Sequence, residues 1–176
     1  MPPKIPNSLL GLAREVEAWI SFGCPDRALA KLNPLLDTPG ARPTGLALEV
    51  RALIEMKRYQ EALGCLEELR GFGNDAEWLD VTEGWCFKRL GQLQAAIECM
   101  RRLVARSPRS ATGHFNLGCY LALDGKIETA LDEVTMACGI DQNFRALAAN
   151  EADLDSIREH PRFLELLPKE PPKDSG

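Results

Sequence analysis

The sequence predicts an all-α protein built from about four stacked pairs of helices. Three observations support this prediction: a 34-residue spacing between equivalent positions, helical periodicity of the apolar residues within each period, and glycines between the two helices of a pair. One helix pair cannot bury its apolar face alone, so successive pairs are expected to stack around a continuous core. The expected architecture is a right-handed superhelical solenoid with a short C-terminal helical cap.

The 34-residue spacing is clearest at alanines that each precede an aliphatic residue: Ala28-Leu29, Ala62-Leu63, Ala96-Ile97 and Ala130-Leu131. A second column, placed between the expected helices, holds Gly23, Lys57, Gly91 and Gly125. A third column holds Leu32, Leu66, Met100 and Val134. Small residues of the first helix, Gly84 and Gly118, are expected opposite Ala96 and Ala130 of the second, so that two backbones approach closely.

Each period divides into two helices joined by a short turn. In the third period, helices are expected over 78–89 and 93–106, and Ser107-Pro108 ends the second because proline cannot continue a helix. In the fourth, they are expected over 114–123 and 127–138. Glycine in the intervening turn allows the left-handed backbone conformation that often follows a helix end.

These columns resemble the tetratricopeptide-repeat (TPR) family, whose 34-residue signature is W-x2-L-G-x2-Y…A-x3-F…P. The resemblance covers about residues 8–142 and is strongest in the last two repeats, because Val16 and Val50 stand where the signature has glycine. The predicted organisation is an N-terminal arm (1–7), four TPR units (9–42, 43–76, 77–110 and 111–144), C-terminal capping helices (143–167) and a disordered tail (168–176).

The expected cap consists of two short helical segments separated at Pro161. Its ending, D-L-x-x-I-R-x-x-P-x-F, resembles the tails that close many bacterial TPR stacks. Apolar residues in these segments are expected to cover the last repeat: Leu154, Ile157, Phe163, Leu166 and Leu167.

Composition and charge exclude several classes of protein. A net charge of −5 argues against a general nucleic-acid-binding protein, which would carry a basic surface. No apolar run is long enough to span a bilayer and no targeting segment is visible, so we expect a cytoplasmic protein without membrane contact. The six cysteines form no CxxC pair and no zinc-finger spacing with histidine; we expect small buried apolar residues, with no metal or cofactor.

Catalysis has little support in the sequence, so a non-enzymatic protein is expected. Only His114 and His160 would titrate near neutral pH with unperturbed side chains. His114 occupies a repeat position where bulky side chains pack, and His160 precedes Pro161 in the expected cap. An enzyme with a site using His114 or His160 is therefore the most distant alternative.

The TPR resemblance implies that the first helix of each pair lines a concave groove. Groove positions carried over from the family predict one partner-binding surface formed by Arg51, Trp78, Val81, Trp85, Lys88, Arg89, Phe115, Asn116 and Cys119. The same positions in the first two repeats include Ala13, Glu17, Ile20, Ala47 and Ile54. An alternative remains open, in which Trp78 and Trp85 pack between helices or under the C-terminal segment.

The predicted function is that of a TPR adaptor or scaffold, which binds a peptide or partner helix in its groove. TPR domains that hold chaperone C-terminal acids use Lys, Asn and Arg in successive first helices; Lys88, Arg89 and Asn116 are present here, but Ala13, Glu17 and Leu48 replace the others. The partner is therefore not identified. One alternative is a dedicated cytoplasmic chaperone that resembles type III secretion translocator chaperones, and exposed apolar surface would allow a homo-oligomer.

Overall fold

The computed structural model describes residues 5–73 and 75–168, and their regular structure is helical throughout, without a strand. The chain divides into two compact units, Met1–Gln92 and Leu93–Gly176. This boundary falls between the two helices expected for the third repeat, whose limits at 77 and 110 stay a prediction, as do those of the other repeats. The all-α expectation is confirmed.

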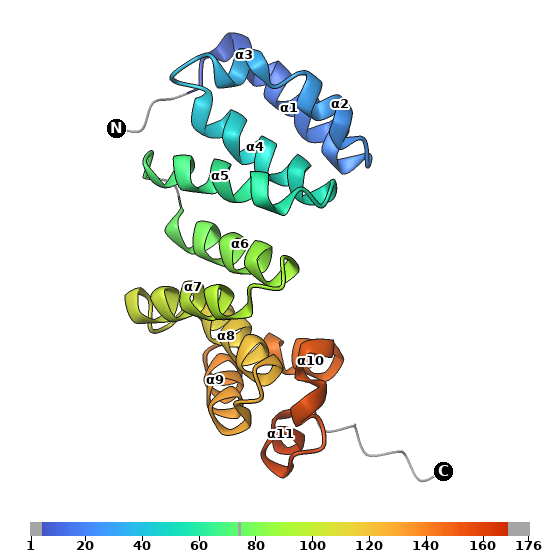
Figure 1. Cartoon of the computed structure of the whole chain (residues 1–176), viewed down its shortest axis with the longest axis vertical. Coiled ribbons are helices and arrows are strands. Elements are labelled where there is room, and N and C mark those ends of the chain that lie inside the picture. Colours follow the sequence, from blue (N-terminus) through green and yellow to red (C-terminus); the bar gives the residue numbers. More distant parts are fainter. Residues whose placement is uncertain (1–4, 74, 169–176) are drawn as a thin grey trace. The chain divides into compact units, whose positions relative to one another are not determined.

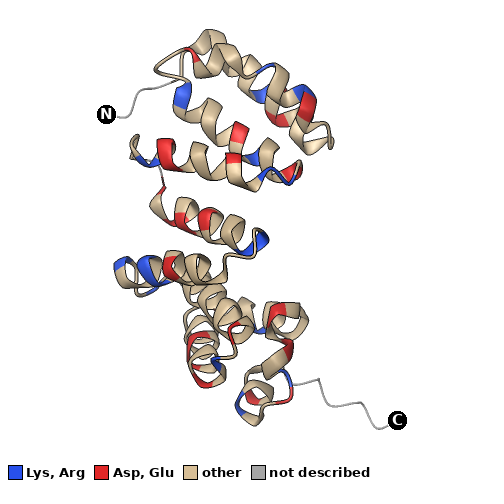
Figure 2. Ribbon diagram, in the orientation of Figure 1, with Lys and Arg blue, Asp and Glu red and all other residues tan. Residues whose placement is uncertain are grey.

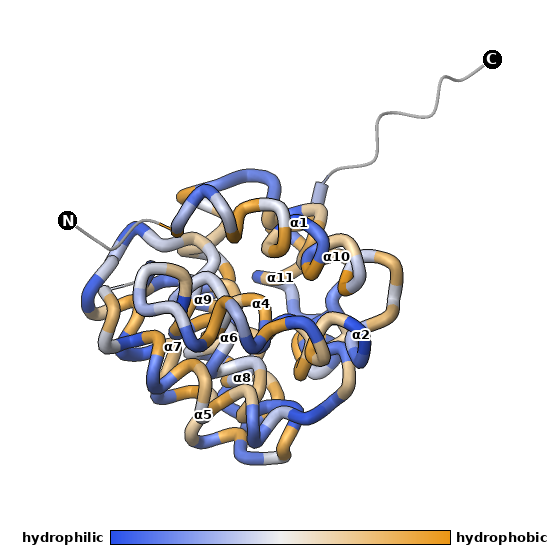
Figure 3. Tube along the Cα trace, turned by 90° about the horizontal axis from the view of Figure 1, so that it is seen from above, coloured by the Kyte–Doolittle hydropathy of each residue, from blue (hydrophilic) through white to orange (hydrophobic). Residues whose placement is uncertain are grey.

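The first unit is a stack of helices in chain order (Figure 1). It comprises α1 (Asn7–Ser21), α2 (Pro25–Ala30), α3 (Asn33–Leu36), α4 (Arg42–Glu55), α5 (Tyr59–Arg70) and α6 (Ala76–Arg89). Helices α1, α4 and α6 are the first helices of the three repeats that begin in this unit, and their exposed surface is called the first-helix face below. Hydrophobic and hydrophilic stretches alternate along the helices, as expected when one side of each is buried (Figure 3).

The second unit contains the rest of the stack and the cap (Figure 1). It comprises α7 (Leu93–Arg106), α8 (Ala111–Leu123), α9 (Ile127–Ile140), α10 (Asn143–Asn150), the 3₁₀ helix η1 (Ala152–Ile157) and α11 (Pro161–Leu166). The helices expected over 93–106, 114–123 and 127–138 agree with α7, α8 and α9 to within a few residues.

The first repeat departs from a simple helix pair because its second helix is divided into α2 and α3. Pro34 lies in the first turn of α3 and has no backbone N–H to donate to a carbonyl of the preceding turn. The chain therefore ends α2 at Ala30, turns through Lys31 and Leu32, and begins a new four-residue helix. Leu32 and Leu35 remain buried despite this break.

The repeat columns correspond to buried positions. Each alanine of the 34-residue column is completely buried: Ala28, Ala62, Ala96 and Ala130. The column four residues later is also buried: Leu32, Leu66, Met100 and Val134. Residues four apart lie on the same side of a helix, so these two columns mark the side of each second helix that packs into the core.

Gly118 allows α8 and α9 to approach closely. A Cβ atom placed on Gly118 would lie 2.6 Å from Val134 Cγ2 and 3.1 Å from the backbone oxygen of Ala130. A side chain cannot move the backbone of Ala130 aside without shifting the helix. The expected apposition of Gly118 and Ala130 is therefore confirmed in the second unit.

The turns between paired helices share one backbone conformation. Gly23, Gly91 and Gly125 have φ angles of 70°, 75° and 75°, and Lys57 has a φ of 59°. These residues are the column of the sequence that holds three glycines and one lysine. Since the left-handed region suits glycine and strains a residue with a Cβ atom, Lys57 has adopted the turn geometry of its repeat at an energetic cost.

The C-terminal cap closes the second unit largely as expected. Leu154, Ile157 and Phe163 are buried, whereas Leu166 and Leu167 are only partly buried. Arg162 of α11 also forms exposed ion pairs with Glu128 and Asp132 of α9, which add little to the apolar contacts of the cap. The predicted disordered tail, apart from Pro168, lies outside the described residues.

We predict that Gly118→Ala destabilises the protein by about 1–3 kcal/mol, because the added methyl group overpacks the contact with α9. Gly139→Ala is the matched control: it is also helical, but a Cβ atom there meets nothing within 4 Å. That substitution should stabilise the protein by about 0.4–1 kcal/mol, because alanine lowers the conformational entropy of the unfolded chain. Urea denaturation measures both, and equal effects of the two substitutions would contradict the close approach.

We predict that Lys57→Gly stabilises the protein by about 0.5–1 kcal/mol. Relief of the left-handed strain at Lys57 exceeds the entropy that an added glycine gives the unfolded chain. Lys57→Ala removes the same side chain but keeps the strained Cβ atom, so its stability should not rise. Thermal denaturation of the two variants side by side tests this, and a stabilising Lys57→Ala would refute the explanation.

Candidate functional site

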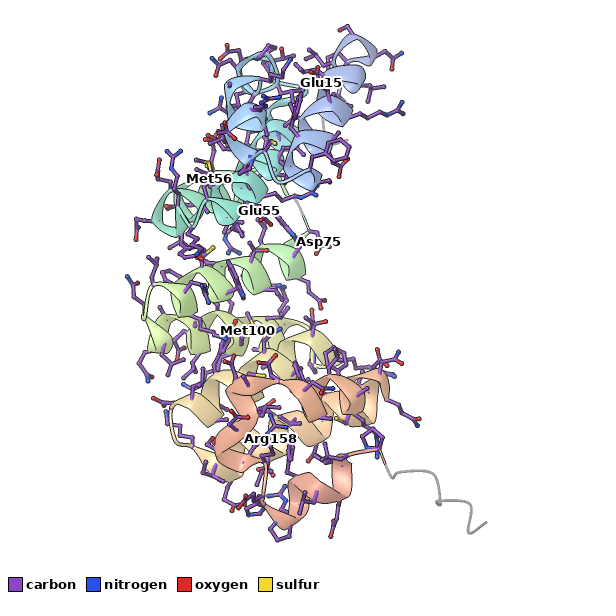
Figure 4. All side chains as sticks on the ribbon, turned by 90° about the vertical axis from the view of Figure 1, so that its right-hand side faces the viewer. Glu15, Glu55, Met56, Asp75, Met100 and Arg158 are labelled. Carbon is purple, nitrogen blue, oxygen red and sulfur yellow. The ribbon has the colours of Figure 1, made fainter. Side chains whose placement is uncertain are left out.

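Two shallow hollows lie on the first-helix face between α1 and α4. The first has a volume of about 320 Å³ and is lined by Ile20, Ser21, Gly23, Arg51, Ile54 and Glu55. The second has a volume of about 270 Å³ and is lined by Ile5, Leu10, Ala13, Arg14, Glu17, Thr44, Ala47, Leu48 and Arg51. Figure 4 labels Glu55, which lies at the C-terminal end of α4. Six of the lining residues occupy positions that the repeat assigns to the groove: Ala13, Glu17, Ile20, Ala47, Arg51 and Ile54. Of the nine residues predicted as one surface, only Arg51 lines these two hollows.

Arg51 lies where the two hollows meet, because it lines both. Its Nη1 atom donates to Glu17 Oε1 at 2.7 Å, across exactly one repeat period of 34 residues. Both side chains are about half exposed, so this ion pair contributes little to stability. It can therefore open or rearrange at small cost when a partner approaches.

An aromatic and basic cluster lies at the C-terminal end of α6 and the start of α5. The rings of Tyr59 and Trp85 meet edge to face, with centroids 5.4 Å apart and planes at 82°. The guanidinium of Arg89 lies 5.7 Å from the centroid of each ring. Arg89 Nε also donates to the hydroxyl of Tyr59 at 3.3 Å. Figure 2 shows this end of α6 in blue, from Lys88 and Arg89.

The remaining predicted residues of α6 are neither fully buried nor fully exposed. Trp78, Val81, Trp85 and Lys88 are all partly buried. Trp78 and Trp85 pack against the core cluster that includes Leu66. Each tryptophan therefore packs partly in the core and keeps some accessible surface. One part of the side chain packs between helices, and another part remains available on the first-helix face.

The other predicted groove residues belong to the second unit and offer less surface. Phe115 is 7% exposed and packs against Phe144 of α10, with ring centroids 5.0 Å apart. Cys119 is buried, and Asn116 donates from its side chain to the carbonyl of Thr112. The proposal of a single groove formed by all nine residues stays a prediction.

A third hollow, of about 480 Å³, lies between α5 and α6 and has a more polar character. It is lined by Gln60, Leu63, Gly64, Glu67, Arg70, Glu83 and Phe87. Arg70 binds Glu83 at 2.6 Å and also the buried carboxylate of Asp80 at 3.0 Å. The charged side chains of Arg70 and Glu83 in this lining are therefore already paired within the first unit.

His114 does lie beside a carboxylate, but its geometry is structural. Its Nδ1 atom is 2.5 Å from Glu133 Oε2, and its Nε2 atom is 3.0 Å from the carbonyl oxygen of Pro108. Both ring nitrogens contact groups of the second unit, so the imidazole is held within the fold. His160 accepts a hydrogen bond from the backbone N–H of Arg162 at the start of α11.

Cys65 and Cys86 lack the lowered pKa of an activated nucleophile. All six are free thiols. Burial and, secondarily, Glu49 raise the pKa of Cys65 to about 12, and burial raises the pKa of Cys86 to about 11. Thiols with such pKa values stay protonated and unreactive at neutral pH. In residues 5–73 and 75–168, no three His, Cys, Asp or Glu side chains gather to form a metal site.

Solved structures identify the architecture of the chain. The TPR protein YrrB, whose structure is reported to have an unusual peptide-binding site, shares 19% identity with a TM-score of 0.64, over 89% of this chain and 81% of YrrB. The chain has the TPR fold. MamA from Desulfovibrio magneticus RS-1 gives 18% identity and a TM-score of 0.66, over 89% of this chain and 88% of that one. A further MamA structure shares 14% identity with a TM-score of 0.67, over 86% of this chain and 89% of that one.

The sequence itself matches no family model and no curated protein. The TPR fold is typically a protein-interaction scaffold and usually non-catalytic. None of the described helices is both long enough and apolar enough to cross a bilayer.

Tyr59 is a part of the site that the repeat pattern does not predict. It lies 34 residues before Leu93 and 68 before Ile127, in a column where an apolar side chain suffices for packing. The hydroxyl distinguishes it, because a buried tyrosine usually pairs its O–H with a polar group. That feature could have drawn attention to Tyr59, but it does not indicate that the pairing group is Arg89.

We predict that Trp85→Ala lowers the free energy of unfolding by about 2 kcal/mol, roughly half the cost of truncating a fully buried tryptophan. Trp78→Ala is the control on the same helix; it lacks the ring contact with Tyr59 and should cost less. Urea denaturation measures both. A loss above about 4 kcal/mol for Trp85→Ala would assign the side chain to the core alone.

Proposed function

We propose that this chain is a non-enzymatic adaptor of the cytoplasm that binds a peptide or partner helix on its first-helix face. The observation that carries the proposal is the pair of hollows meeting at Arg51, since six of their lining residues occupy positions that the TPR repeat assigns to the groove. The peptide-binding site reported for YrrB, a protein of the same fold, supports this use of the fold.

The open form and apolar lining of the hollows favour protein side chains as ligands. Both hollows are open at the surface, whereas small-molecule sites enclose most of their ligand. Apolar side chains line both hollows, with Ile20 and Ile54 in the first, and Leu10 and Leu48 in the second. An interacting segment could place one apolar residue in each while polar groups meet Arg51 and Glu17.

The proposal is tested by selecting binding peptides from a random display library against the full chain. We predict that Ile54→Glu and Ala13→Glu each weaken the selected peptides about tenfold or more, because a buried carboxylate replaces apolar lining in one hollow. Affinities are measured by isothermal titration calorimetry. Urea denaturation of each variant establishes that it remains folded.

Met136→Glu is the matched control. Met136 is 51% exposed and lies on α9 in the second unit, so the same charge is added away from the first-helix face. Its peptide affinity should stay within about twofold of that of the original chain. Peptides that bind folded Ile54→Glu and Ala13→Glu as tightly as the original chain would refute the assignment of this face.

A further inference from the structure

Arg89 is an exposed cation that the fold holds in position without a carboxylate. Its Nε atom donates to Tyr59, and its guanidinium lies within 6 Å of two ring centroids, where a cation is attracted to the aromatic faces. Among the described residues no acidic side chain pairs with it. The bond to Tyr59 uses Nε, which leaves the donors of both terminal nitrogens for another group.

Other arginines of the first unit are used differently. Four of them pair with carboxylates of the chain: Arg42 with Glu68, Arg51 with Glu17, Arg58 with Glu61, and Arg70 with Asp80 and Glu83. The chain carries 26 acidic residues, so carboxylates are not scarce. Arg89 differs from these four because aromatic residues hold it and none of the described carboxylates pairs with it. It differs from Arg27, which also lies over a tryptophan, because its Nε atom donates to Tyr59.

A fixed guanidinium suits a planar anion. Two parallel N–H groups can bind both oxygens of a carboxylate, and such bidentate pairs are stronger and more directional than bonds from a lysine. Tyr59 and Trp85 restrict the rotamers of Arg89 before binding, so less conformational entropy is lost when the anion arrives.

Apolar side chains of α4 and α6 pack against the same core cluster as Tyr59, which holds this guanidinium. They are Ile54 near the end of α4, and Trp78 and Trp85 of α6. Ile54 also lines the first hollow. A segment that places one apolar residue in the first hollow and another against Trp85 spans α4 and α6, and we place the acidic side chain that meets Arg89 within that segment.

We propose that Arg89, held by Tyr59 and Trp85, receives the carboxylate of an internal Asp or Glu side chain, and that the partner is therefore a segment in which apolar residues flank an acidic one. This inference rests on the proposed function of the first-helix face and names the chemistry of the ligand. Tyr59 acts as a positioning residue, because it orients Arg89 and is itself 8% exposed.

The experiment compares peptides selected on the full chain with versions in which each acidic residue is replaced by its amide. The original chain should bind the acidic peptide about tenfold more tightly than the amide peptide, because a charge-assisted pair is lost in the latter. In Arg89→Gln this preference should disappear, while affinity for the amide peptide stays within about twofold. Tyr59→Phe should reduce the preference and leave affinity for the amide peptide unchanged.

Arg27→Gln is the matched control for charge. Arg27 also lies over a tryptophan, 4.8 Å from the ring centroid of Trp19, but it belongs to α2 and lines neither hollow. The preference for the acidic peptide should persist in this variant. If Arg27→Gln and Arg89→Gln lost the preference for the acidic peptide equally, the effect would come only from net charge, and the inference would be overturned.

Two other outcomes would also overturn it. Selected peptides that bind the first-helix face without any acidic residue, and that are indifferent to Arg89→Gln, would leave the proposed function standing and refute the role of Arg89. Loss of binding on amidation of the peptide's C-terminus alone would assign the carboxylate to a chain end. Failure of the proposed function is distinct, since it requires that Ile54→Glu and Ala13→Glu leave binding unchanged.

Discussion

Close packing between the two helices of a pair is the constraint on which the rest of the structure depends. Gly118 meets the backbone of Ala130 and the side chain of Val134 with no room for even one methyl group. The alanines equivalent to Ala130 in the other periods are completely buried. Since the interaxial distance of packed helices is set by the side chains at their contact, small residues at these positions determine how each pair is formed.

The position of the small residues also determines which side of each first helix packs against its partner helix and which side stays exposed to solvent. Once one side of α1 and α4 is fixed by packing, residues on the opposite side of these helices form the first-helix face. Residues one period apart then become neighbours across adjacent first helices, as the bond between Arg51 and Glu17 shows. The recurring left-handed turn preserves this spacing from one repeat to the next, even where Lys57 must adopt it.

Features that depend on periodicity could be predicted from the sequence, and features that depend on particular side-chain pairs could not. Burial of Ala28 and Ala96 follows from the 34-residue column. By contrast, the division of the first repeat's second helix at Pro34 interrupts the pattern without changing its period. The packing of Phe115 against Phe144 depends on where α10 lies after the last repeat.

The contact of Arg89 with Tyr59 illustrates the same limit at the candidate site. Both residues were visible in the sequence, and Arg89 was assigned to the groove by its position in the repeat. Their meeting joins the start of α5 to the end of α6, 30 residues apart, and no repeat column relates the two. Periodicity therefore identifies a surface, whereas the structure shows how a cation on that surface is held.

Isoleucine methyl groups provide the most direct measurement of whether partners use this surface. Ile20 and Ile54 line the first hollow, whereas Ile97, Ile127 and Ile157 belong to the second unit. In a methyl NMR titration of the full chain with a selected peptide, we predict that the largest shift changes occur at Ile20 and Ile54. Large changes at Ile97, Ile127 or Ile157, with Ile20 and Ile54 unmoved, would contradict it.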